Sequence, residues 1–163
     1  MEIFYSHLTK ERIACYKLVM IIVSACLAGI NCAYNGKNNR EPIIESLVKK
    51  GKAIPLCPEQ LSGFSTPRLR MEIIGGDGKD VLKHKAKVVN IEGENVTNLI
   101  LNGVKEVFKI VKLVGAKEVI FKDKSPSCGV KFIHSGKFDG KLKKGMGVCS
   151  AFLHRKGIKV KGI

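Results

Sequence analysis

The sequence predicts a single α/β domain: a three-layer, Rossmann-like fold with a mostly parallel sheet. Three observations support this prediction. The chain has 163 residues, of which 45% are hydrophobic, enough for one well-buried core. Short apolar runs rich in β-branched residues alternate with segments of helical periodicity, as in strands joined by crossover helices. No internal repeat or linker divides this alternation into separate units.

The amino-terminal part supplies two strands and the helix between them. A continuous run of mainly β-branched residues at 20–25 predicts a strand buried on both faces. We expect Asn39 to cap a helix that has Pro42 in its first turn and that stops at Gly51. The apolar run at 52–56 predicts the second strand.

The middle of the chain is less regular. Residues 58–80 are rich in Pro, Gly, Ser and Thr and lack sustained periodicity, so we expect a long loop there, of the kind that is often functional. A strand is expected at 86–91. Apolar residues at helical spacing from Val96 to Val114 predict the longest helix, which Gly115 ends.

The carboxyl-terminal part completes the alternation. Residues 118–122 predict another buried strand, and a glycine-rich stretch at 135–147 precedes a helix expected at 148–156. A last strand is expected at 158–161, beside the others in the sheet.

The chain is strongly basic, with a formal net charge of +15 and 29 lysine and arginine residues. This charge fits either a polyanionic partner such as RNA or a solvated lysine surface. Only five of the basic residues are arginine, there is no tryptophan, and the few aromatic residues do not alternate with the lysines. The scarcity of arginine forks and stacking rings favours the solvated surface.

Residues 1–19 are expected to be an extension outside the fold, because Met20 is an alternative start and the domain then spans 20–163. The first apolar run ends in Val-Ser-Ala-Cys, which resembles a lipoprotein cleavage box and would make Cys26 a lipid anchor. We favour a core strand, because a structured loop follows and the run is shorter than the roughly 18 apolar residues of a membrane span. No membrane partner is therefore expected.

Three of the six cysteines occupy equivalent places in the predicted topology. Cys26, Cys57 and Cys128 each follow the carboxyl end of a predicted parallel strand, the edge at which open α/β sheets bind ligands. The three can therefore share one crevice, and three thiolates favour a soft metal or an iron–sulfur centre. Since a domain of this size needs no disulfides, we expect reduced thiols and a cytoplasmic location.

Other interpretations of the cysteines stay open at this stage. Buried cysteines often pack as small hydrophobic residues, although a structural zinc site would normally include a short C-x2-4-C pair, which is absent. We expect Cys149 in the core and Cys15 in the extension. Cys32 lies near Cys26 in sequence and is a spare thiol, a neighbour of a ligand or a ligand itself.

An ordered set of motifs resembles the thiouracil desulfidase (TudS-like) family. The resemblance extends from Met20 almost to the carboxyl end and implies a [4Fe-4S] cluster with three cysteine ligands, which correspond to Cys26, Cys57 and Cys128. It also implies one open iron that binds the sulfur of a thiocarbonyl substrate. The chain departs from the family at Cys149, where threonine is common. The motifs are VSACLAG (23–29), YNG (34–36), LCPEQLSG (56–63), STPR (65–68), GGDGKDV (75–81), NVT (95–97), KDKSPSCG (122–129) and KGMGV (144–148).

The resemblance further implies a catalytic acid/base at Glu59 and a catalytic serine in the loop after the 118–122 strand, at Ser125 or alternatively Ser127. The chemistry fits, because a carboxylate in a partly dry crevice can take a proton from an attacking water. The alternative is structural: Glu59 could cap the element after Pro58, and both serines could make turn hydrogen bonds.

Two further residues are candidates for substrate binding. Arg68 could bind a substrate carbonyl or phosphate, or could pin its own loop, and Tyr34 is the second candidate. Three histidines of the expected domain, His84, His134 and His154, show no paired spacing and are expected at the surface.

These features together predict a non-redox desulfidase that removes sulfur from a thiolated pyrimidine base or nucleoside, a small-molecule substrate, and releases hydrogen sulfide. Desulfuration of thiouridine in tRNA is the alternative reaction, which the surplus of lysine allows. The alternative class is a non-catalytic iron–sulfur or zinc-binding module.

Overall fold

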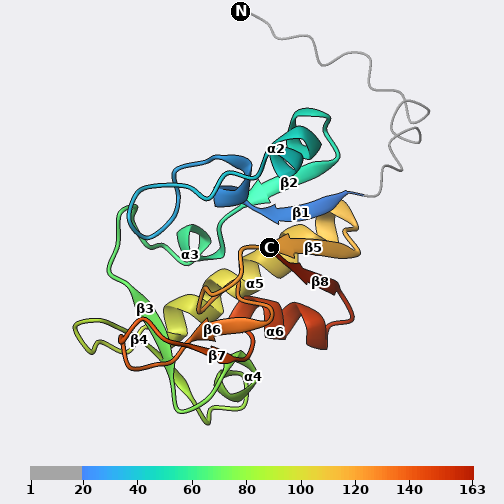
Figure 1. Ribbon diagram of the computed structural model, residues 1–163. Helices are drawn as coiled ribbons and strands as arrows, with labels where there is room; N and C mark the ends of the chain where they lie inside the picture. The colour runs from blue at the N-terminus through green and yellow to red at the C-terminus, as the bar shows by residue number, and fades with distance from the viewer. Residues whose placement is uncertain (1–19) are drawn as a thin grey trace, which may run out of the picture.

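The computed structural model describes residues 20–163, so the expected extension and Cys15 lie outside the described residues. Four parallel strands form the main sheet (Figure 1), and the four strands expected at its positions are confirmed. Across the sheet they are β2 (Ala53–Leu56), β1 (Ile21–Ser24), β5 (Glu118–Phe121) and β8 (Lys159–Gly162).

Helices cover both faces of this sheet, which confirms the three-layer α/β fold. α2 (Pro42–Lys49) packs on one face, and α5 (Thr97–Val114) and α6 (Val148–Arg155) pack on the other. Strand β1 faces both ways: the side chain of Ile22 joins the larger core and that of Val23 the smaller one. A strand buried on both faces explains the unbroken apolar run in the sequence.

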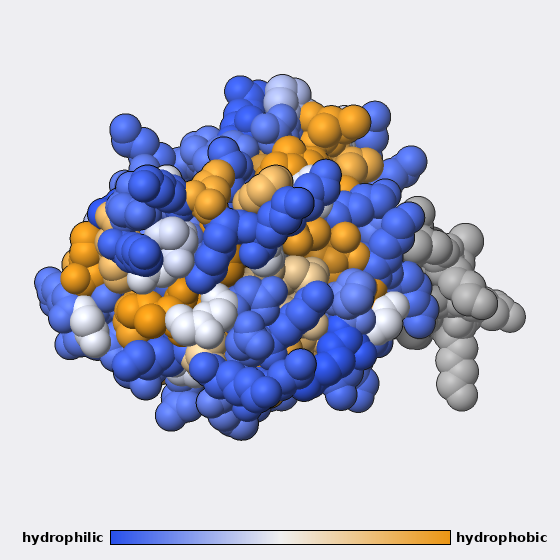
Figure 2. Space-filling model, turned by 60° about the horizontal axis from the view of Figure 1, so that its bottom comes forward, coloured by the Kyte–Doolittle hydropathy of each residue, from blue (hydrophilic) through white to orange (hydrophobic). Residues whose placement is uncertain are grey.

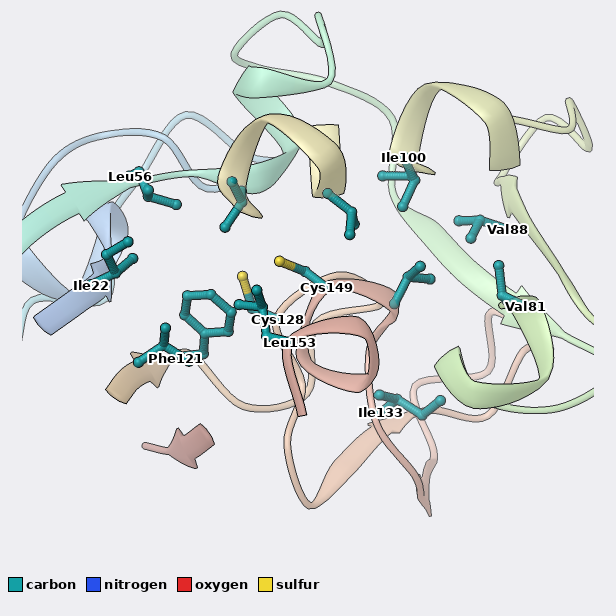
Figure 3. Packing of buried hydrophobic residues seen from close by; sticks show 14 of the residues in the cluster. Ile22, Leu56, Val81, Val88, Ile100, Phe121, Cys128, Ile133, Cys149 and Leu153 are labelled. Carbon is teal, nitrogen blue, oxygen red and sulfur yellow. The ribbon is translucent and has the colours of Figure 1, made fainter. Parts of the chain in front are cut away.

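The larger core contains two of the cysteines. Figure 3 shows Cys128 and Cys149 among the aliphatic side chains packed between α5, α6 and the sheet. Cys149 is fully buried, so its expected place in the core is confirmed. Gly115 ends α5 with φ of 65°, as expected for a glycine just after a helix.

The prediction of a long loop at 58–80 is wrong, because three short elements lie there. They are α3 (Pro58–Leu61), β3 (Met71–Ile74) and α4 (Gly78–Val81). β3 pairs antiparallel with β4 (Lys87–Asn90) in a separate two-stranded sheet. α3 and α4 are single helical turns, too short to show helical periodicity in the sequence. α4 is held by a capping box, in which Asp77 and Asp80 accept hydrogen bonds from each other's backbone N–H.

Two further expectations require correction. The glycine-rich stretch adjoins an antiparallel hairpin of β6 (Phe132–His134) and β7 (Leu142–Lys144), which the sequence did not predict. The residue at the amino-terminal cap of α2 is Glu41 rather than Asn39, and its side chain makes no capping hydrogen bond. Pro42 at the first helical position fixes φ there, which supports the helix start without a polar cap.

Hydrophilic residues dominate the face shown in Figure 2, and hydrophobic residues appear there in separate groups. Among the described residues, no helix combines the length and the apolar character that a membrane span requires.

Candidate active site

A cavity of about 470 Å³ lies at the carboxyl ends of β1, β2 and β5, the ends that point toward η1 (Ala25–Ala28) and α3 in Figure 1. The three cysteines predicted as ligands all line this cavity. The parallel strands explain how residues so distant in sequence meet, because each strand delivers its following loop to the same edge of the sheet.

The backbone around Cys26 turns sharply away from the sheet. Strand β1 ends at Ser24, the single turn of η1 carries Cys26, and Gly29 follows in the left-handed region at φ of 88°. The backbone N–H of Asn39 donates to the carbonyl oxygen of Cys26 at 3.0 Å. This bond ties the returning loop to the first thiol and makes it part of the cavity wall.

Cys57 joins β2 to α3. Its backbone is extended, with φ of −117°, and it stands at the amino-terminal cap of α3 directly before Pro58. α3 packs against α5 at Gly103, where a Cβ atom would collide with the Ser62 hydroxyl and the Pro58 carbonyl. This close approach fixes α3, and with it the position of Cys57 and of Glu59.

Cys128 lies in the loop that follows β5, and a network of backbone bonds shapes that loop. One carboxylate oxygen of Asp123 accepts hydrogen bonds from the N–H groups of Val130 at 2.8 Å, Lys131 at 3.1 Å and Phe132 at 3.2 Å. Burial opposes ionisation of Asp123, but these bonds outweigh it and lower its pKa. The hydroxyl oxygen of Ser125 accepts from the N–H of Cys128 at 3.1 Å.

The fourth thiol at the cavity belongs to Cys32. Its side chain is 1% exposed, and its thiol lies beside the thiols of Cys26 and Cys57. The Cys57 thiol also donates to the carbonyl oxygen of Cys32 at 3.8 Å. Cys32 is therefore not a surface thiol that merely lies near Cys26 in sequence.

The thiols differ in how readily they lose a proton. The hydrogen bond from Cys32 lowers the pKa of Cys26, and a second such bond brings the pKa of Cys57 to about 7 in spite of burial. The same two bonds raise the pKa of Cys32. Burial raises the pKa of Cys128 well above the ordinary value for a thiol. Cys26 and Cys57 are thus the thiols most easily deprotonated.

A buried ion pair stands beside the thiols. The Glu59 carboxylate accepts from Arg68 Nε at 2.6 Å, and the exposed fractions of the two side chains are 10% and 5%. The Ser125 hydroxyl donates to the other carboxylate oxygen at 3.2 Å. Glu59, Arg68 and Ser125 all line the cavity, so a carboxylate and a hydroxyl in contact face the same space as the thiols.

The nitrogen atoms of Arg68 are all engaged within the protein. Nη1 donates to the Ser65 carbonyl and the Thr66 hydroxyl, and Nη2 donates to the carbonyl oxygen of Cys32 at 2.9 Å. These contacts favour the loop-pinning interpretation of Arg68 over direct capture of a substrate phosphate. Tyr34, the other candidate for substrate binding, is 45% exposed and lines the cavity.

The two serine candidates are placed differently. Ser125 lines the cavity, whereas Ser127 does not, and its fully buried hydroxyl has no hydrogen-bond partner among the described residues. His84 and His154 are exposed, as predicted. The surface prediction for His134 is wrong: it lies on β6, lines the cavity, and its Nδ1 is buried. The β6–β7 hairpin that carries it left no periodic signal in the sequence.

The donor set suits a cluster better than a single ion. Within residues 20–163, no three Cys, His, Asp or Glu side chains gather closely enough to hold one metal ion. A cubane cluster takes each thiolate on a different iron, so its ligands stand apart around a larger space. The thiols of Cys26, Cys57 and Cys128 line one cavity from three different strand ends, and their soft sulfur atoms are the donors that such a cluster takes.

The chain matches one known protein family over nearly all of its described residues. The family model described as 2-thiouracil desulfurase matches residues 21–162. The chain belongs to this family. The resemblance seen in the sequence motifs is thereby confirmed.

Two individual proteins are similar to this chain over most of its length. The Bacillus subtilis (strain 168) protein named "Uncharacterized protein YbbK" is 48% identical over 141 residues, which cover 86% of this chain and 93% of that protein. The solved structure of TudS, a [4Fe-4S]-dependent thiouracil desulfidase, matches with a TM-score of 0.77 and 32% identity. That match covers 88% of this chain and 89% of TudS.

Proposed function

We propose that this protein is an iron–sulfur-dependent, non-redox desulfidase that removes sulfur from a thiolated pyrimidine base or nucleoside and releases hydrogen sulfide. The observation that carries the proposal is the shared cavity, into which three separate strand ends bring Cys26, Cys57 and Cys128 beside Glu59. The family membership and the likeness to TudS, itself [4Fe-4S]-dependent, support the same assignment.

Cys26, Cys57 and Cys128 would hold a [4Fe-4S] cluster by one iron each. The fourth iron would then have no ligand from this set. When bound, the cluster would supply a soft Lewis acid that polarises a carbon–sulfur double bond. The five described cysteines are free thiols, which is the state that ligation requires. Such thiols persist in a reducing compartment, so we place the protein in the cytoplasm.

The overall reaction is a hydrolysis without electron transfer. Water adds its oxygen to the thiocarbonyl carbon, the carbon–sulfur bond breaks, and the sulfur leaves with both hydrogens as hydrogen sulfide. Glu59 is the base that takes the proton of the attacking water, because its carboxylate is the acceptor beside the thiols. The Ser125 hydroxyl, in contact with that carboxylate, positions the water or passes the proton.

Arg68 acts by positioning rather than by catalysis. Its guanidinium donates to the Glu59 carboxylate through Nε and to the Cys32 carbonyl through Nη2. These bonds fix the position of the base relative to the loop that carries Cys32. A carboxylate that arrives already oriented needs no reorganisation during the reaction.

The test is loss of thiocarbonyl absorbance when the anaerobically reconstituted protein is incubated with thiouracils and thiouridine nucleotides. We expect Glu59→Gln to retain its iron but to lose about 100-fold or more in turnover, as is common when a general base is removed. Glu92→Gln, an exposed carboxylate outside the cavity, is the matched control and should match the wild type. Full turnover by Glu59→Gln would remove Glu59 from the mechanism.

One observation favours thiouridine in tRNA as the second candidate substrate. Lys37, Lys122 and Lys124 line the cavity, and none of them forms an ion pair within residues 20–163. If tRNA is the substrate, turnover on thiolated tRNA should exceed that on the nucleotide and should fall steeply with salt. Stoichiometric zinc with no turnover on either substrate would instead indicate a non-catalytic module.

A further inference from the structure

Cys32 is the one cavity-lining thiol that the proposed reaction leaves without a role. It is buried, its thiol lies beside those of two proposed ligands, Cys26 and Cys57, and its carbonyl oxygen accepts a hydrogen bond from the Cys57 thiol at 3.8 Å. A cysteine that packs as a small hydrophobic residue would be surrounded by apolar side chains, as Cys149 is in the core. Cys32 belongs to neither apolar cluster and lines the cavity together with the three proposed ligands.

The backbone of Cys32 is held in place by the site itself. Its carbonyl oxygen accepts from Arg68 Nη2 at 2.9 Å, and the neighbouring Tyr34 carbonyl accepts from the Arg68 backbone N–H at 2.8 Å. The loop that carries Cys32 is thus attached to the residue that also orients Glu59. Its outer residues, Asn35 and Lys37 among them, are exposed at the cavity.

The number of thiols is the key point. A [4Fe-4S] cluster is commonly held by four cysteine thiolates, and Cys32 brings the thiols around this cavity to four. A cluster with four permanent protein ligands would have no iron available for substrate sulfur. Ligation by four cysteines and an iron that can bind substrate sulfur are compatible only if one of the four ligands can be displaced.

We infer that Cys32 is a releasable fourth ligand, which occupies the remaining iron until the substrate sulfur displaces it. This inference rests on the proposed function. The exchange replaces one iron–sulfur bond with another; the released Cys32 thiolate takes up a proton from solvent, and no electron is transferred. Cys32 is the ligand to be released because Asn31 and Tyr34 on its loop are exposed. Cys26 and Cys57 follow a strand end within two residues, and Cys128 stands between the buried residues Ser127 and Gly129.

The inference makes a prediction that does not depend on turnover. An iron atom without a protein ligand is the one most easily lost, so mild ferricyanide oxidation should convert Cys32→Ala to a three-iron cluster, detectable by electron paramagnetic resonance and iron counting. The substrate-free wild type should resist this loss. Cys149→Ala, which removes a thiol that does not line the cavity, is the matched control and should behave as the wild type.

Substrate binding supplies the second readout. If Cys32 occupies the iron in about nine of ten molecules, its removal should strengthen apparent substrate binding about tenfold, because the competing ligand is gone. Cys32→Ser, which keeps the size and a hydrogen-bond donor, should behave as Cys32→Ala. Binding is measured by titrating the anaerobic cluster-loaded protein with 2-thiouracil or 4-thiouridine monophosphate and following the visible absorption of the cluster.

The outcomes separate the two proposals. Equal rates of iron loss in the wild type and in Cys32→Ala, or a Cys32→Ser variant that keeps its fourth iron as the wild type does, would overturn the inference while leaving the desulfidase proposal intact. Variants that assemble no cluster would make Cys32 a permanent ligand, which also overturns it. A wild-type protein without a cluster would instead overturn the proposed function.

Discussion

Replacement of Arg68 tests how the site holds its base. Arg68→Met keeps a long apolar side chain but removes the guanidinium, leaving the buried Glu59 carboxylate with the Ser125 hydroxyl as its remaining hydrogen-bond partner among the described side chains. Glu59→Gln removes the opposite charge, while Arg68 keeps its bonds to Ser65, Thr66 and Cys32. The two single variants are therefore not equivalent.

The magnitudes follow from burial. An uncompensated buried charge costs about 3–5 kcal/mol, and at 10% exposure the Glu59 side chain approaches that limit, so we expect Arg68→Met to lower the free energy of unfolding by about 3 kcal/mol. Glu59→Gln should cost about 1–2 kcal/mol, because Arg68 retains polar partners. The double variant should cost less than the sum, with a coupling of roughly 1–3 kcal/mol.

The assay is urea unfolding of the reduced protein, followed by far-ultraviolet circular dichroism at neutral pH. With a slope of about 2 kcal/mol per molar urea, a loss of about 3 kcal/mol moves the midpoint by about 1.5 M. Strict additivity of the two single substitutions would refute the reasoning, since it would mean that Glu59 and Arg68 do not stabilise each other in the folded protein.

Three further predictions concern the elements around the cavity. Gly103→Ala should cost about 1–3 kcal/mol in urea unfolding because its Cβ would push α3 away, whereas Lys105→Ala on the exposed side of α5 should be nearly neutral, and equal effects would contradict the packing argument. The lowered pKa of Asp123 means that its contribution to stability is present above about pH 4 and is lost as the pH falls through the pKa of the folded state. Asp123→Asn should therefore make the free energy of unfolding depend less on pH in the acid range. An unchanged dependence would contradict this. Ser125→Ala should lower desulfidase turnover about tenfold or more, while Ser127→Ala, which removes a buried hydroxyl without a partner, should keep it; the reverse order would move the catalytic role to Ser127.

The parallel sheet was predictable because β1, β2 and β5 are mostly apolar runs and the longest helix, α5, keeps a clear helical period. The amphipathic pattern from Val96 onward and the stop at Gly115 needed no tertiary information. The edge of the sheet at which ligands bind followed from topology alone, which is why the positions of Cys26, Cys57 and Cys128 at one cavity could be anticipated.

The remaining elements depend on contacts that the sequence does not display. α3 and α4 have four residues each, and the β6–β7 hairpin has strands of three, so none reaches the length at which periodicity is measurable. His134 was missed for this reason. The surroundings of Cys32 and the hydrogen bonds of Arg68 depend on how the loops that carry these two residues pack together. No local sequence pattern predicts that packing.

Anaerobic iron and sulfide analysis of single cysteine variants tests the central claim most directly. The wild type and Cys149→Ser should each bind about four irons per chain, as a [4Fe-4S] cluster requires, whereas Cys26→Ser, Cys57→Ser and Cys128→Ser should each bind far less. Four irons retained in any one of these last three variants, or a wild type that binds none, would contradict the account.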